Sequence, residues 1–227
     1  MWAFGDRFFS QPRSENLSFF VYLRMRHAAI RAKGATILKA LEDKILEEGT
    51  VLPGNILKVG SFLNHQLDAD FLMEMGREIA RLFADAGVTR VLTIESSGIA
   101  IAVAAAAAMH VPAVFAKKNK TKNLSDDVFG VTVYSFTHGR EYPVVVSKEY
   151  IKPGDRVLIV DDFLAVGNAL RGLISLVGQA GATVAGCAIA IEKGFQHGGD
   201  SLRAEGVRVE SLAIVDSMTD TQVVFRS

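Results

Sequence analysis

One stretch, residues 156–169 with the sequence R-V-L-I-V-D-D-F-L-A-V-G-N-A, constrains the fold of the chain more than any other. It starts with four apolar, mostly β-branched residues, 157–160. A short run that is apolar on both faces is typical of a central strand in a parallel sheet covered by helices. Asp161 and Asp162 end this strand, and a loop of small residues opens the next amphipathic helix. The stretch therefore predicts an α/β domain with a ligand site at the carboxyl end of a buried strand.

The loop after this strand consists of Ala165, Val166, Gly167, Asn168 and Ala169. A helix N-terminus at the carboxyl edge of an open α/β sheet offers backbone N–H groups and a positive dipole end to a phosphate. The two preceding carboxylates accept hydrogen bonds from hydroxyl groups. Acids on ribose hydroxyls and a loop on a 5-phosphate would together bind a sugar phosphate. An ordinary strand, loop and helix with two solvated acids is the alternative.

This stretch resembles the 5-phosphoribosyl-1-pyrophosphate (PRPP) motif of the type I phosphoribosyltransferases, a hydrophobic strand, D-D and a short loop with glycine before a helix. The resemblance implies an α/β fold with a parallel sheet of about five strands, flanking helices and a small hood built from the first and last segments. There is one departure, because Val166 stands where the family usually has Asn or Thr. A lost hydrogen bond to a charged phosphate would weaken binding by about 1.5 to 3 kcal/mol.

Composition favours a single domain that binds small molecules. The chain has 227 residues, 49% of them hydrophobic, and a formal net charge of zero. This length supports a full core, and zero net charge gives no general argument for binding nucleic acid or an acidic membrane surface. The longest apolar run, residues 99–109, is about half of the ~20 residues that a membrane helix needs. The single cysteine, Cys187, lies in an apolar run and is predicted to be a buried, inert thiol, consistent with a reducing cytoplasm.

Residues 1–35 differ from the rest of the chain. They carry six basic and two acidic side chains without clean periodicity: Arg7, Arg13, Arg24, Arg26, Arg31 and Lys33 against Asp6 and Glu15. A targeting leader, an arm that binds a partner and an upstream extension all agree with this composition. We favour a non-catalytic extension, and we expect the domain to cover residues 36–227 with Thr36 as the N-cap of its first helix.

Four other segments have predicted structures. Residues 61–66 are expected to form a polar loop with Phe62 and Leu63 embedded in it, which resembles a lid. Residues 70–87 are expected to form a helix with one apolar face, and residues 207–214 an edge strand. Residues 128–146 alternate around a turn at His138 and predict a β-hairpin.

A second phosphate-binding loop is expected after the strand at residues 90–94. Glu95, Ser96, Ser97 and Gly98 precede an alanine-rich helix and present backbone N–H groups and hydroxyls to an anion. A serine that merely caps the helix is an equally good explanation of these four residues. In the resembled family, the loop at this place holds the pyrophosphate of PRPP.

Two further segments are candidates for substrate contacts. Residues 117–122 hold four lysines, Lys118 among them, and predict either a solvated loop or a mobile hood that brings cations to a leaving pyrophosphate. Lys193 and Phe195 follow the strand at residues 184–191, where an ammonium group and a ring can hold a heterocycle. A solvated lysine after a capped strand is the alternative.

Taken together, the motifs I-L-K-V, S-F-L-N-H-Q, T-I-E-S-S-G-I-A, V-D-D-F-L-A and I-E-K-x-F-Q resemble those of the bacterial xanthine phosphoribosyltransferases. The resemblance covers about four fifths of the chain. It places base contacts at Leu57, Asn64 and Lys193, with Phe195 beside them, and ribose contacts at Asp161 and Asp162.

The implied reaction is purine salvage, in which xanthine and PRPP give xanthosine monophosphate and pyrophosphate. The resemblance further implies Mg²⁺, held mainly through PRPP and in part by Asp161, a homodimer and a cytoplasmic location, without a nucleic-acid or membrane partner. Two alternatives keep the fold. One is an enzyme that prefers hypoxanthine or guanine, and the other is a PRPP-sensing transcription regulator without catalysis.

Overall fold

The domain is built on one six-stranded sheet. The computed structural model of the chain describes residues 37–118, 127–135, 139–219 and 221–226. The strand order is β10-β9-β8-β7-β3-β4, in which five strands are parallel and β10 pairs antiparallel with β9. The strands are β3 (Arg90–Ile94), β4 (Ala113–Ala116), β7 (Arg156–Leu164), β8 (Thr183–Lys193), β9 (Val209–Met218) and β10 (Val223–Phe225). The predicted edge strand is therefore β9, and its position at the edge was wrong because β10 covers it.

The central strand β7 contains the predicted apolar run, and residues 157–160 are buried. Its end was predicted wrongly, because the strand continues through both acids to Leu164. The neighbouring strand β8 is longer and pairs with β7 as far as Leu164 opposite Glu192. Each acid is thus held by a backbone that is already part of the sheet, and this fixes the direction of its side chain.

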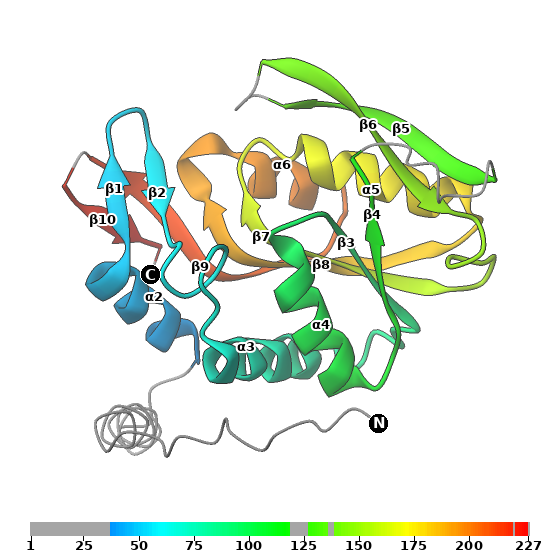
Figure 1. Ribbon diagram of the computed structural model, residues 1–227, viewed down its shortest axis with the longest axis horizontal. Helices are drawn as coiled ribbons and strands as arrows, with labels where there is room; N and C mark the ends of the chain where they lie inside the picture. The colour runs from blue at the N-terminus through cyan, green and yellow to red at the C-terminus, as the bar shows by residue number, and fades with distance from the viewer. Residues whose placement is uncertain (1–36, 119–126, 136–138, 220, 227) are drawn as a thin grey trace, which may run out of the picture. The chain divides into compact units, whose positions relative to one another are not determined.

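Helices cover both faces of the sheet. Figure 1 shows α3 (Ala69–Leu82) and α4 (Gly98–Met109) on one face, and α5 (Asn168–Gln179) and α6 (Gly198–Ala204) on the other. The predicted helix at residues 70–87 is α3, but it ends five residues early, and the chain then turns before Gly87. Its N-cap is Asp68, whose carboxylate accepts the Phe71 N–H at 3.2 Å.

A group of elements from the two ends of the domain lies at one end of the sheet, around its edge strand β10. It comprises α2 (Ile37–Glu48), the antiparallel pair β1 (Thr50–Leu52) and β2 (Ile56–Lys58), and β10 from the end of the chain. Residues of α2, β1 and β10 line a common groove of about 570 Å³. The hood predicted from the first and last segments of the domain is this group of elements, α2, β1, β2 and β10. Thr36, the predicted N-cap, lies outside the described residues.

The segment at residues 61–66 is anchored more firmly than a polar lid. Phe62 and Leu63 are fully buried, and the Phe62 ring contacts the Phe71 ring edge to face with 6.3 Å between centroids. The two apolar residues expected within this polar loop are therefore buried, and its role as a lid stays a prediction. Because Phe62 packs on Phe71 of α3 and Leu63 is also buried, the backbone that carries the polar residues of this segment is anchored to the domain.

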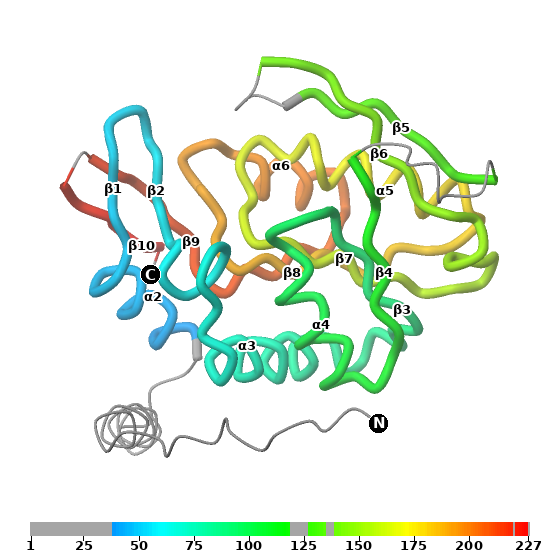
Figure 2. The backbone as a smooth tube through the Cα atoms, viewed as in Figure 1, coloured from blue at the N-terminus to red at the C-terminus, as the bar shows by residue number. Residues whose placement is uncertain are grey.

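The predicted hairpin consists of β5 (Val128–Ser135) and β6 (Arg140–Ser147), which pair antiparallel along their whole length. The hairpin lies over α5 (Figure 2), where a Cβ on Gly172 would be 2.6 Å from a methyl group of Val133. The predicted turn residue His138 lies outside the described residues.

Cys187 is buried in β8, as predicted. Burial, with a smaller contribution from the charge of Asp161, raises the pKa of its thiol to about 12. The thiol is therefore not a nucleophile at neutral pH. No helix in the described part of the chain is both long and apolar enough to span a membrane.

Candidate active site

The acid pair of β7 lies at the carboxyl edge of the sheet and meets a residue from the other end of the domain. Asp161 is 6% exposed, whereas Asp162 is half-buried. The Asp162 N–H donates to Asp161 Oδ1 at 3.0 Å, and Asn64 Nδ2 donates to Asp162 Oδ2 at 3.3 Å. A predicted base contact and a predicted ribose contact, 98 residues apart in sequence, therefore lie in one site.

The environment of Asp161 favours its protonated form. Burial raises the pKa of this carboxyl well above its usual value, and the charge of Asp162 raises it further, while the ammonium of Lys118 lowers it. Tyr142, on β6, has its own pKa raised by burial and by the charge of Asp161. The two acids thus differ in character. Asp161 is an enclosed carboxyl that keeps its proton to higher pH than an exposed aspartate, whereas Asp162 is only half-buried.

The loop after β7 is a backbone cradle at the start of α5. Gly167 is the N-cap residue of α5, with a φ of 90°, a left-handed conformation that favours glycine. Because glycine has no side chain, the first N–H groups of α5 receive no side-chain cap from this residue. The backbone N–H groups of residues 166–169 make no hydrogen bond to another described residue. The side chain of Asn168 is engaged elsewhere, since its Nδ2 donates to the Tyr134 carbonyl at 3.2 Å. Binding of an anion here therefore depends on the backbone and the helix dipole.

The loop after β3 comes close to the acid pair. Its Glu95–Ser96 peptide bond is cis, and Ser97 is the N-cap of α4 without a side-chain capping bond. Ser97 therefore occupies the N-cap position of the serine-cap alternative, but its hydroxyl does not cap the helix. A Cβ on Gly98 would lie 2.8 Å from Asp161 Oδ1 and 2.3 Å from Thr93 Oγ1. Glycine is required at position 98 because the second loop packs directly on the buried acid.

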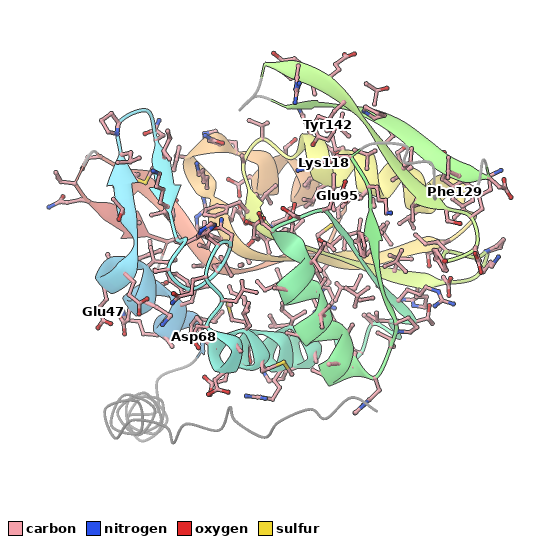
Figure 3. The ribbon with its side chains drawn as sticks, in the orientation of Figure 1. Glu47, Asp68, Glu95, Lys118, Phe129 and Tyr142 are labelled. Atoms are coloured by element: carbon pink, nitrogen blue, oxygen red, sulfur yellow. The ribbon has the colours of Figure 1, made fainter. Side chains whose placement is uncertain are left out.

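Glu95 holds the base of the lysine segment. Its Oε1 accepts the Lys118 backbone N–H at 2.7 Å, and the Lys118 ammonium lies 5.7 Å from the centroid of the Tyr142 ring. Figure 3 shows these three residues together between β3, β4 and β6. The carboxylate of Glu95 is thus committed to positioning the chain, while the charge of Lys118 lowers the pKa of Asp161. Residues 119–126, the rest of the predicted lysine loop, lie outside the described residues.

The predicted base contacts lie beside the hood. Lys193 ends β8, and its Nζ donates to the Asn55 carbonyl in the turn between β1 and β2 at 2.9 Å. The same ammonium is 5.8 Å from the centroid of the Phe163 ring, and burial lowers its pKa. Leu57 is buried on β2, and Phe195 is half-buried in the 3₁₀ turn η1 (Gly194–Gln196) directly after Lys193.

Comparison with known proteins agrees with this arrangement. The family model described as phosphoribosyl transferase domain matches residues 60–217 of the chain. The chain belongs to the phosphoribosyltransferase family. A xanthine phosphoribosyltransferase from Bifidobacterium longum is 55% identical over 192 residues, covering 83% of this chain and 100% of the relative. One from Lachnoclostridium phytofermentans is 53% identical over 191 residues, covering 83% of this chain and 98% of the relative.

Solved phosphoribosyltransferase structures share the fold. The adenine phosphoribosyltransferase from Rhodothermus marinus aligns with a TM-score of 0.64 at 26% identity, covering 79% of this chain and 99% of the other. The Leishmania tarentolae adenine phosphoribosyltransferase also aligns with a TM-score of 0.64, at 17% identity, covering 80% and 90% of the two chains. The predicted family and the predicted parallel-sheet fold are therefore confirmed.

The donor set of this phosphoribosyltransferase fits a magnesium ion carried by substrate. Among the described residues, no group of three or more His, Cys, Asp or Glu side chains converges as a metal site. Mg²⁺ usually keeps several waters and binds through one or two carboxylates plus substrate phosphates. The acid pair, in which Asp162 is only half-buried, is a donor set of that kind.

Three residues of the site were missed in the sequence. Thr93 is 1% exposed, and its hydroxyl has no hydrogen-bond partner among the described residues. Phe163 faces Lys193 and directly follows the acids, so an aromatic residue after D-D was the available signal. Asn55 was not detectable, because its contribution is a backbone carbonyl brought in by the β1–β2 turn.

Proposed function

We propose that this phosphoribosyltransferase transfers the 5-phosphoribosyl group of PRPP to xanthine, producing xanthosine monophosphate and pyrophosphate. The observation that carries the proposal is the identity of 52% to 55% with several relatives named xanthine phosphoribosyltransferase, each matched over nearly its whole length.

The two loops and the acid pair divide PRPP between them. The cradle at residues 165–169 receives the 5-phosphate, and the loop of Glu95, Ser96, Ser97 and Gly98 receives the pyrophosphate. Asp161 and Asp162 face the ribose between them, because Gly98 packs on Asp161 and the cradle follows the same strand. Positive charge develops at the anomeric carbon when pyrophosphate leaves, and the Asp162 carboxylate stabilises it.

Lys193 selects the base. The fold is shared with adenine phosphoribosyltransferases, so the fold alone does not choose the purine. An ammonium group has three donors and no acceptor, and one donor is used by the Asn55 carbonyl. The remaining donors pair with a 6-oxo group, whereas the 6-amino group of adenine would be left facing them. Leu57 and Phe195 supply apolar contacts to the ring, and Asn64 lies between base and ribose.

Magnesium, when bound with PRPP, neutralises the charge that builds on the departing pyrophosphate. Asp162 would hold it on the ribose side, together with Asp161 once that carboxyl has lost its proton, and Lys118 brings a further positive charge to the same edge. Two other features implied by the resemblance, a homodimer and a cytoplasmic location, stay predictions.

The test is turnover by the purified full-length chain with PRPP, Mg²⁺ and each purine in turn, followed by pyrophosphate release. Xanthine should give the highest kcat/KM, and adenine should give none above background. A preference for hypoxanthine or guanine would keep the reaction and change the substrate. Absence of turnover with every purine, together with specific DNA binding, would replace the proposal by a PRPP-sensing regulator.

A further inference from the structure

Arg171 connects the phosphate cradle to the helix behind it. This residue lies in the first turn of α5, and its Nη1 donates to the Val166 carbonyl at 3.2 Å. Its Nη2 donates to Ser201 Oγ at 2.8 Å and to Glu205 Oε1 at 2.5 Å. A single guanidinium therefore joins one loop carbonyl to two side chains at α6.

The place of this arginine is unusual for helix energetics. The N-terminus of a helix carries positive partial charge, so a cation in the first turn is disfavoured and an anion is favoured. Arg171 is offset by Glu205, whose own pKa it lowers through their hydrogen bond. The ion pair with Glu205 therefore offsets the unfavourable position of a cation at this end of the helix. It also holds the guanidinium of Arg171 against the Val166 carbonyl of the loop.

A hydrogen bond to the Val166 carbonyl also sets the direction of the next N–H group. The peptide between Val166 and Gly167 is trans, and in a planar trans peptide the C=O and N–H bonds point in opposite directions. With the carbonyl held toward Arg171, the Gly167 N–H is directed away from it. This N–H has no hydrogen-bond partner among the described residues. It is one of the donors on which the cradle depends, because position 166 has no polar side chain.

Gly198 supports the same peptide from a second side. A Cβ at position 198 would lie 2.1 Å from the Ala165 oxygen, 2.7 Å from the Val166 carbonyl carbon and 2.9 Å from the Gly167 nitrogen. The first residue of α6 thus packs its backbone directly on the cradle. The peptide is held by packing at Gly198 and by a charged hydrogen bond at Arg171, and both contacts come from outside the loop.

We propose that Arg171 is a positioning residue for PRPP, which orients the Val166–Gly167 peptide so that the Gly167 N–H binds the 5-phosphate, with Ser201 and Glu205 as its anchor. The inference rests on the proposed function, since it assigns the 5-phosphate to this cradle. The competing explanation is that Arg171 only fastens α5 to α6 and contributes stability without affecting PRPP.

The variant Arg171→Met separates these explanations, because it keeps most of the apolar stem and removes all three hydrogen bonds. The KM and the calorimetric Kd for PRPP with Mg²⁺ should each rise about tenfold, the effect of losing one well-oriented donor to a charged group. The KM for xanthine should change less than twofold. The matched control is Arg81→Met, which removes an exposed arginine paired with Glu78 on α3 and should leave both constants unchanged.

A second set of variants leaves the arginine in place. Glu205→Gln combined with Ser201→Ala weakens the anchor at exposed positions and should raise the KM for PRPP by a smaller factor, with the melting temperature nearly unchanged. In a double-mutant cycle with Arg171→Met, the effects on PRPP should be less than additive, because all three residues act through one carbonyl.

The outcomes are distinct. An unchanged Kd for PRPP in Arg171→Met, with active wild type, would overturn the inference and leave the proposed function standing. Equal rises in the KM for both substrates, accompanied by a lower melting temperature, would assign Arg171 a merely structural role. A wild-type protein that binds no PRPP would overturn the proposed function and this inference with it.

Discussion

Replacing Arg203 by methionine should destabilise the domain strongly, because it would leave a buried carboxylate without its ion-pair partner. Glu192 precedes Lys193 on β8 and has 0% exposure. Arg203 on α6 donates to both of its oxygens, at 3.0 Å from Nη1 and 2.7 Å from Nη2. Ser211 Oγ donates to the same carboxylate at 2.5 Å and would be its only remaining side-chain partner among the described residues.

The magnitude follows from the burial. Removing one member of a buried ion pair costs about 3 to 5 kcal/mol, mainly through the uncompensated charge that remains. For a domain of this size, each kcal/mol lowers the melting temperature by roughly 2 to 4 °C. The expected loss for Arg203→Met is therefore roughly 6 to 20 °C.

The chain contains a matched control. Arg81 donates to both oxygens of Glu78 at 2.9 Å and 2.7 Å, which is nearly the same geometry, but the Arg81 side chain is 68% exposed. Exposed pairs contribute about 0 to 1 kcal/mol, so Arg81→Met should lower the melting temperature by less than about 4 °C.

Calorimetry and urea unfolding of the two variants, side by side, measure the difference. A double variant, Arg203→Met with Glu192→Leu, should recover much of the lost stability, because an apolar pair of similar volume replaces the buried ions. Equal losses for Arg203→Met and Arg81→Met, or no recovery in the double variant, would refute the argument from burial.

Four other predictions concern the site and the chain terminus. Lys193→Met should reduce discrimination among purines by removing a hydrogen bond worth about 1 to 3 kcal/mol. Asp162→Asn should instead lower kcat/KM by a similar factor for xanthine, guanine and hypoxanthine, and the reverse pattern would exchange the base role of Lys193 and the ribose role of Asp162. Since the pKa of Asp161 is raised in the folded state, the folded protein binds this proton more tightly than the unfolded chain, and stability falls as pH rises from about 4 through the folded pKa. Melting temperatures of Asp161→Asn should lack this fall, and the same pH dependence in the variant and the wild type would contradict the raised pKa. Lys118→Ala should depress turnover without lowering the melting temperature, and normal turnover would remove Lys118 from the site. Deleting residues 1–34 should leave activity and melting temperature unchanged, and a loss of either would show that they contribute to the domain.

Much of the site could be predicted because its residues follow strands. In a parallel sheet, the carboxyl ends of strands meet at one edge, and the sequence placed a candidate ligand contact directly after each of β3, β7 and β8. Asp161, Gly98 and Lys193 each carried a local signal of this kind. The apolar run of β7 likewise indicated its central place in the sheet.

The remaining features depend on contacts between segments that are distant in the chain. The pairing of β7 with a long β8 decided that the acids lie inside a strand, and the sequence of β7 alone carries no information about its partner's length. Phe62 and Leu63 were expected within a polar loop, but their full burial and the contact of Phe62 with Phe71 of α3 depend on a segment outside the loop. Arg171 had no local signal either, because its partners at Ser201 and Glu205 lie 30 and 34 residues away.

The central claim, that this phosphoribosyltransferase acts on xanthine, is tested most directly by competition. Equal concentrations of xanthine, guanine, hypoxanthine and adenine, incubated together with PRPP, Mg²⁺ and the enzyme, give mononucleotides whose initial ratio equals the ratio of kcat/KM values. Mass spectrometry of the products should find xanthosine monophosphate in excess over the other three, with adenosine monophosphate the least abundant. A mixture dominated by any other mononucleotide, or one without mononucleotides, would contradict the account.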